Sequence, residues 1–156
     1  MTSLRRTTVH AGLVGGVVGG VAIWLYEALV WAGVQKLMPL VNIPKNAVGL
    51  VFGQATQASL GKTAYLLGTA IHFGFAMVWG VIFALLWPIF RQRHVEATLA
   101  ALLFAPLLWV VMHIAITAMS HEHPDYTDVR VIMGGIMSHL FYTVPLALVV
   151  KHKTAR

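Results

Sequence analysis

Four ionisable side chains stand inside long apolar stretches of this sequence: Glu27, His72, His113 and His139. Histidine titrates near neutral pH and binds metal ions through its neutral ring, and a carboxylate can take part in either chemistry. An ionisable group inside a bilayer costs on the order of 2.5–3.5 kcal/mol on insertion scales, so such groups usually face the interior of a helix bundle and mark function. The set is a candidate site for binding or relaying protons, or for Zn²⁺ or Cu²⁺.

Each of the four side chains belongs to a different apolar stretch. Counting about 1.5 Å per helical residue places all four at roughly 9–16 Å from the outer end of its stretch. We therefore expect one polar cluster in the outer half of a four-helix bundle, and the alternative is a purely structural hydrogen-bond network between the helices. Hydroxyl groups near the histidines could hold the ring N–H groups; these are Thr117, Ser138 and Thr143.

A second, weaker candidate site lies in a connection near residue 120. His121, Glu122, His123 and Asp125 fall within five residues and have the ligand types that suit Zn²⁺ or Cu²⁺. The competing interpretation is ordinary capping, in which Asp125, Thr127 or Asp128 caps the next helix and complements its positive end. We favour capping, because a His-x-His pair without a regular frame is a weak motif.

The composition identifies the class of protein that must position these groups. The chain has 156 residues, of which 58% are hydrophobic and 10% charged, against roughly 45–50% and about 25% in a soluble domain. This excludes an ordinary soluble protein and a disordered chain, and it predicts a single integral membrane domain over residues 1–156. The chain lacks cysteine, which excludes thiolate chemistry, and it lacks the Walker A, GxSxG and HExxH motifs, so no enzymatic reaction is indicated.

Hydropathy and length predict an all-α bundle of four transmembrane helices. The expected spans are 9–38, 63–90, 95–119 and 129–150, each long enough to cross about 30 Å of hydrocarbon. Pro39 and Pro44 should end the first helix, and the connection that follows is predicted to hold a short interfacial helix.

Basic residues orient the predicted bundle. Seven of the eleven Lys and Arg residues fall in alternate connections, which favours both termini in the cytoplasm of a bacterial inner membrane. The same distribution indicates that the basic residues behind the net charge of +6 are attracted to anionic lipid headgroups. We therefore expect a lipid bilayer and no nucleic acid as partner. The seven residues are Arg5, Arg6, Arg91, Arg93, Lys151, Lys153 and Arg156.

Small residues at helical spacing predict where helices touch. Lipid provides no hydrophobic drive for association, so close backbone approach at glycine holds transmembrane helices together. We expect these faces to pack within one chain, with a homo-oligomer interface as the alternative. The predicted packing glycines are Gly12, Gly16, Gly20, Gly68, Gly80 and Gly135.

The run GLVGGVVGG from Gly12, followed by Glu27 and then by His72, His113 and His139 at their spacing, resembles the YagU-like family of bacterial inner-membrane proteins. The resemblance covers most of the chain and implies a multi-pass inner-membrane protein of unknown biochemical function with a role in acid tolerance. It supplies no catalytic residue.

Two further functions compete with the polar cluster. The chain could be an accessory subunit of a larger respiratory or photosynthetic complex that docks through its five tryptophans and its glycine faces. It could also bind haem b between two of the three intramembrane histidines, which is the less favoured cofactor. The tryptophans are Trp24, Trp31, Trp79, Trp87 and Trp109.

Overall fold

The computed structural model describes residues 3–36, 38–119 and 127–155. Regular structure in these ranges is helical throughout. Its elements are α1 (Ser3–Tyr26), a π-helical segment η1 (Glu27–Val34), a 3-10 turn η2 (Leu40–Asn42), α2 (Ile43–Phe52), α3 (Gln54–Ser59), α4 (Thr63–Gln92), α5 (Ala97–Met119) and α6 (Val129–Lys153).

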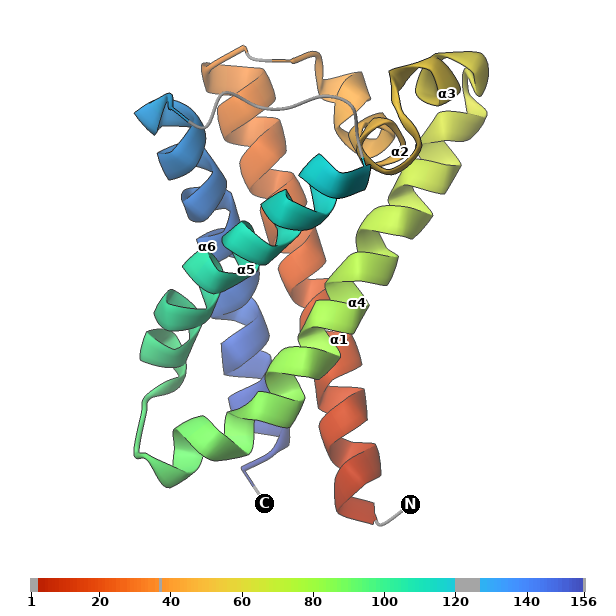
Figure 1. The fold of residues 1–156 in the computed structure, drawn as a ribbon. Helices are drawn as coiled ribbons and strands as arrows, with labels where there is room; N and C mark the ends of the chain where they lie inside the picture. Colours follow the sequence, from red (N-terminus) through yellow and green to blue (C-terminus); the bar gives the residue numbers. More distant parts are fainter. Residues whose placement is uncertain (1–2, 37, 120–126, 156) are drawn as a thin grey trace.

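Four segments are long and apolar enough to cross a membrane, as the hydropathy predicts. They are α1 with η1, α4, α5 and α6, and their bounds lie close to the predicted spans except at both ends of the first, which begins several residues before position 9. That span ends at Val34 rather than at 38, and Lys36 adopts a left-handed conformation with φ 53° before the chain reaches Pro39. Both termini lie at the same end of the bundle, which we call the terminal end (Figure 1).

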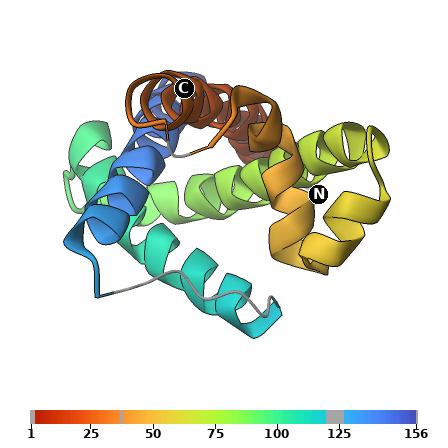
Figure 2. The ribbon, with the colours of Figure 1, turned by 90° about the horizontal axis from the view of Figure 1, so that it is seen from above.

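The four long helices are not packed equally. α1 lies between α4 and α6, and α5 packs mainly on α6. α4 and α5 diverge toward the end opposite the termini, as both views show (Figures 1 and 2). Aromatic side chains connect these two helices nearer the terminal end, where Phe83 is fully buried with its ring centroid 5.2 Å from that of Phe104.

Glycines bring α1 into close contact with both neighbours. A Cβ atom placed on Gly16 would lie 2.8 Å from the Cα of Met77 on α4, and one on Gly80 would lie 2.8 Å from the Cα of Gly16. On the other side of α1, a Cβ on Gly19 would lie 2.6 Å from the carbonyl oxygen of Tyr142 on α6. Such separations are open only to glycine, so the small-residue stripes set the distance between these helices.

The connection after the first span holds α2 and α3. α2 begins with Pro44 in its first turn, where a missing N–H costs nothing. Val48 of α2 is fully buried, and the carbonyl of Pro44 lies directly against Gly68 of α4. The helix therefore lies across the diverging end of the bundle and packs mainly on α4 (Figure 2).

Candidate functional site: a histidine pair between α5 and α6

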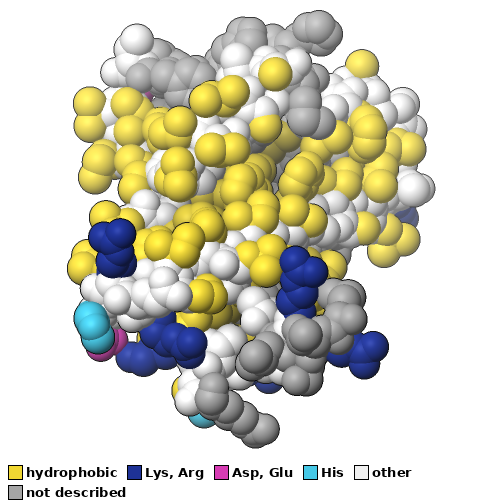
Figure 3. Space-filling view, turned by 60° about the horizontal axis from the view of Figure 1, so that its bottom comes forward, with side chains coloured by type: hydrophobic (Ala, Val, Ile, Leu, Met, Phe, Trp, Pro, Cys, Tyr) yellow, Lys and Arg dark blue, Asp and Glu magenta, His cyan; other side chains and the backbone are white. Residues whose placement is uncertain are grey.

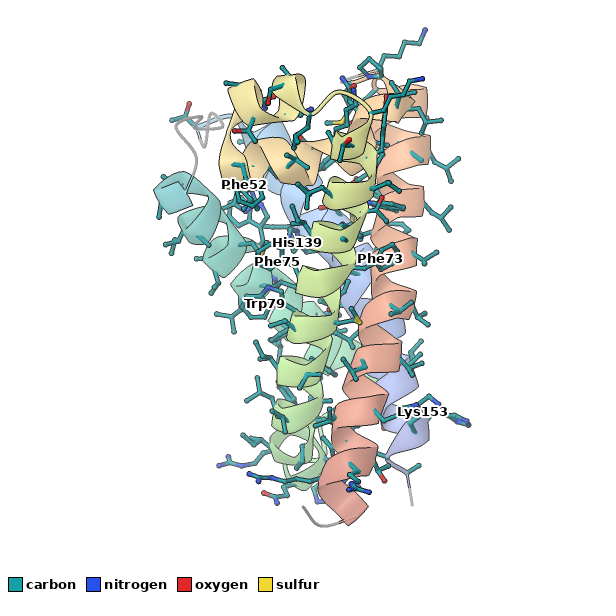
Figure 4. The ribbon with its side chains drawn as sticks, turned by 90° about the vertical axis from the view of Figure 1, so that its right-hand side faces the viewer. Phe52, Phe73, Phe75, Trp79, His139 and Lys153 are labelled. Atoms are coloured by element: carbon teal, nitrogen blue, oxygen red, sulfur yellow. The ribbon has the colours of Figure 1, made fainter. Side chains whose placement is uncertain are left out.

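Two of the four predicted ionisable residues come together. The ring centroids of His113 on α5 and His139 on α6 are 6.3 Å apart, and the ring planes make an angle of 54°. His139 lies in the half of the bundle nearer α2, far along α6 from Lys153 (Figure 4). The pair therefore joins two helices at membrane depth.

The hydrogen bonds of the pair determine where each ring carries its proton. Nδ1 of His113 lies 2.6 Å from the carbonyl oxygen of Trp109, and Nδ1 of His139 lies 2.8 Å from that of Gly135. A carbonyl oxygen only accepts, so in both rings Nδ1 carries a hydrogen, and in the neutral form of each ring Nε2 then carries the lone pair. This arrangement, with one ring nitrogen donating to a backbone carbonyl, is the one that presents the other nitrogen to a proton or a metal ion.

The local sequence explains this geometry. Each histidine follows its carbonyl partner by four residues, so the two groups stand one helical turn apart on the same face. Gly135 has a second effect, because a Cβ there would lie 2.8 Å from Cδ1 of Trp109. The missing side chain admits the indole, whose ring centroid is 4.5 Å from that of His113.

His72 belongs to a different part of the bundle. Its Nε2 lies 3.0 Å from the carbonyl oxygen of Gly20 on α1, so this ring carries its hydrogen on Nε2. The ring stacks on Trp24 with centroids 4.9 Å apart and meets the edge of Phe73 at 5.1 Å. His72 therefore joins α4 to α1 and is the opposite tautomer of the pair.

Glu27 is half-buried and is the first residue of the π-helical segment. Within the part of the chain whose side chains the structure describes, its carboxylate makes no hydrogen bond or ion pair. π-helical turns inside membrane helices often lie at functional sites. Among the described residues, no contact connects Glu27 to a histidine.

The predicted hydroxyl partners have different roles. The Ser138 hydroxyl donates to the Gly135 carbonyl at 2.8 Å and lies 3.4 Å from Nδ1 of His139, so it stands beside the pair. Thr143 instead donates to the carbonyl of Ala101 on α5 at 3.2 Å. Thr117 lines the same open apolar hollow on α5 as His113, a space of about 450 Å³.

The second candidate site cannot be placed in the fold. Its residues His121, Glu122, His123 and Asp125 lie outside the described ranges.

The described residues do not assemble the four-ligand zinc set. No three His, Asp or Glu side chains among them come close enough to hold one metal ion, whereas a protein zinc site uses three or four such ligands.

Haem b also fits poorly: the separation of the two rings suits axial ligands, but the indole of Trp109 occupies the space beside Gly135. The described geometry offers two imidazoles, with an indole packed beside them.

Sequence reasoning missed two residues that organise this region. Trp109 lies four residues before His113, and that spacing could have indicated its place beside the ring. Tyr142 is 4% exposed, and its hydroxyl donates to the carbonyl of Ala76 on α4 at 2.6 Å. No local pattern indicates this second contact, because the two residues are 66 positions apart.

Comparison with known proteins gives no further identification. The chain matches no protein-family model, no curated protein and no solved structure.

Proposed function

We propose that this protein is a multi-pass protein of a bacterial inner membrane that takes up a proton at the His113–His139 pair. The observation that carries the proposal is the close approach of two imidazole rings from neighbouring helices, each held through Nδ1 by a backbone carbonyl of its own helix. The resemblance to the YagU-like family, with its role in acid tolerance, is consistent with a device that responds to protons.

The placement in the membrane follows from charge. The basic residues Arg5, Arg91 and Lys153 belong to the terminal end of the bundle, which we assign to the cytoplasm. The histidine pair then lies in the outer half of the bilayer.

The pair should hold one proton before it accepts a second. Two imidazolium ions at a separation of 6.3 Å would repel by roughly 2.5 kcal/mol at an effective dielectric constant of 20. Uptake of one proton puts a positive charge between α5 and α6. This charge would change how the two helices pack against each other, and in that way the protein would respond to pH.

The structure weakens the case for an accessory subunit. Trp79 donates to the sulfur of Met112 at 3.1 Å, Trp24 covers His72, and Trp87 is only 5% exposed. The glycine faces of α1 are likewise filled by α4 and α6. Three of the five tryptophans and the glycine faces of α1 thus make contacts inside the chain, which supports the proton site over a docking role.

Nitrogen NMR of the full-length protein in lipid nanodiscs tests the proposal. With ¹⁵N-labelled histidine, the ring shifts should show the Nδ1–H tautomer at His113 and His139 and the Nε2–H tautomer at His72. Titration with acid should then protonate the pair in two separate steps.

Matched variants separate a pair from a larger cluster. His139→Asn should change the titration of His113, whereas Glu27→Gln and His72→Asn should leave it unchanged. An unchanged His113 titration in His139→Asn would show that the rings share no proton and would end the proposal. Displacement of both Nε2 signals by equimolar Zn²⁺, or a haem absorbance band in the purified protein, would replace it with metal or haem binding.

A further inference from the structure

A separate cavity opens at the terminal end, on the opposite half of the molecule from the histidine pair. It has a volume of about 440 Å³, which is within the range of roughly 300–1,000 Å³ of ligand pockets. Its walls come from the first turns of α1 and the last turns of α4 and α6. Three helices that are distant in sequence therefore build it.

The polar side of the cavity is cationic. Arg91 and Lys153 line it with His10 and His152, and the hydroxyl-bearing residues Thr7 and Thr8 complete that side. None of the described residues that line the cavity is acidic. Glu96, the acidic residue of the nearby α4–α5 turn, binds Lys151 at 2.8 Å and does not line the cavity.

Arg91 is held in position while most of its donors remain available. Its Nη1 donates to the carbonyl oxygen of Thr154 at 3.3 Å, just beyond the end of α6. A guanidinium group has five N–H donors in a planar fork that matches phosphate oxygens, so four are left to bind an anion. The cationic residues at the two helix ends also offset the negative ends of the dipoles of α4 and α6, which would otherwise repel an anion.

The other side of the cavity is apolar. Ala84, Trp87 and Pro88 of α4 form it, and both Ala84 and Trp87 are buried. A tryptophan at this level is typical of the boundary between headgroups and acyl chains. Figure 3 shows Lys and Arg side chains gathered around this end of the molecule, below a broad hydrophobic surface.

We propose that this cavity binds the phosphate group of an anionic phospholipid, with Arg91 and Lys153 on the phosphate and the Trp87 wall beside the start of the acyl chains. A cationic pocket between transmembrane helices at the cytoplasmic face is a recurrent binding site for such headgroups. A free phosphate ion is also an anion, but it has no apolar part to contact the Trp87 wall. A phospholipid matches both the cationic and the apolar side of the cavity.

Native mass spectrometry of the full-length protein tests the site with defined lipids. Phosphatidylglycerol is titrated into the detergent-solubilised protein and compared with phosphatidylcholine of the same acyl chains and with inorganic phosphate. We expect saturable binding of phosphatidylglycerol that exceeds the other two. Each cation contributes about a fivefold factor in affinity, so Arg91→Gln and Lys153→Gln should each weaken binding by that factor and the double variant by about 25-fold.

Arg93→Gln is the matched control, because Arg93 is exposed in the same turn of the chain and does not line the cavity. It should leave the affinity for phosphatidylglycerol within twofold. Equal losses in Arg93→Gln and Arg91→Gln would show diffuse surface attraction and overturn the site. Equal binding of inorganic phosphate and phosphatidylglycerol would overturn the assignment to a lipid, and absence of saturable binding in the unmodified protein would overturn the proposal as a whole.

Discussion

The contact between α1 and α4 at Gly16 allows a sharp test of how this bundle is held together. A Cβ on Gly16 would lie 2.8 Å from the Cα of Met77 and 2.9 Å from the carbonyl carbon of Ala76. Carbon atoms normally meet at about 3.5–4.0 Å, so Gly16→Ala must push the two backbones apart by nearly 1 Å. Backbone atoms cannot rotate away as a flexible side chain can.

Gly74, two residues before Ala76 on the same helix α4, is the matched control. A Cβ at this position would have no atom within 4 Å. Both Gly→Ala changes gain about 0.5–1 kcal/mol from helix propensity. This term cancels when the two variants are compared, and the remaining difference is the cost of overpacking at Gly16, about 1–3 kcal/mol.

The free energy of unfolding of each variant can be measured by titrating SDS into mild-detergent micelles and following tryptophan fluorescence. We expect Gly74→Ala to match or exceed the unmodified protein, Gly16→Ala to be about 1–3 kcal/mol less stable than Gly74→Ala, and Gly16→Leu to be lower still. Equal stability of Gly16→Ala and Gly74→Ala would refute the close contact of α1 with α4.

Three further results are expected. Tyr142→Phe should lose about 0.5–1.5 kcal/mol in the same titration, because its hydroxyl bond to Ala76 joins α6 to α4; an unchanged free energy would show that the bond contributes nothing. The Lys151 ammonium, first by its hydrogen bond and then by its charge, lowers the pKa of Glu96 below its ordinary value. The pair therefore stabilises the fold above that ordinary pKa and is lost as the pH falls through the lowered one. Glu96→Gln should slightly lower the melting temperature at pH 7 and not at pH 2, and an equal effect at both would exclude the ion pair. Alkaline phosphatase fused after Arg156 should be inactive in cells, since we place that end in the cytoplasm; an active fusion would reverse the topology.

Hydropathy and small-residue spacing predicted much of the frame of this protein. Four apolar segments of sufficient length predict four membrane-spanning helices, and α4, α5 and α6 begin within two residues of their predicted positions. These features are local, because the bilayer thickness sets the length of each span and every backbone N–H must bond within its own helix. An even number of spans also brings both termini to one end.

The grouping of the polar residues could not be predicted in the same way. Depth along each helix suggested one cluster, whereas the structure pairs His113 with His139 and turns His72 to Gly20 of α1. Depth is given by counting residues, but the direction of a side chain depends on the rotation of its helix about its own axis.

In a soluble protein, the contrast between an apolar core and water would reveal that rotation. Here the lipid is as apolar as the interior, so an outward-facing leucine and an inward-facing one look alike in the sequence. The glycines predict part of this rotation, since α1 must turn Gly16 toward α4 and Gly19 toward α6. The contacts that complete it, such as Trp109 against Gly135, join residues far apart in the chain, and only the packed structure brings them together.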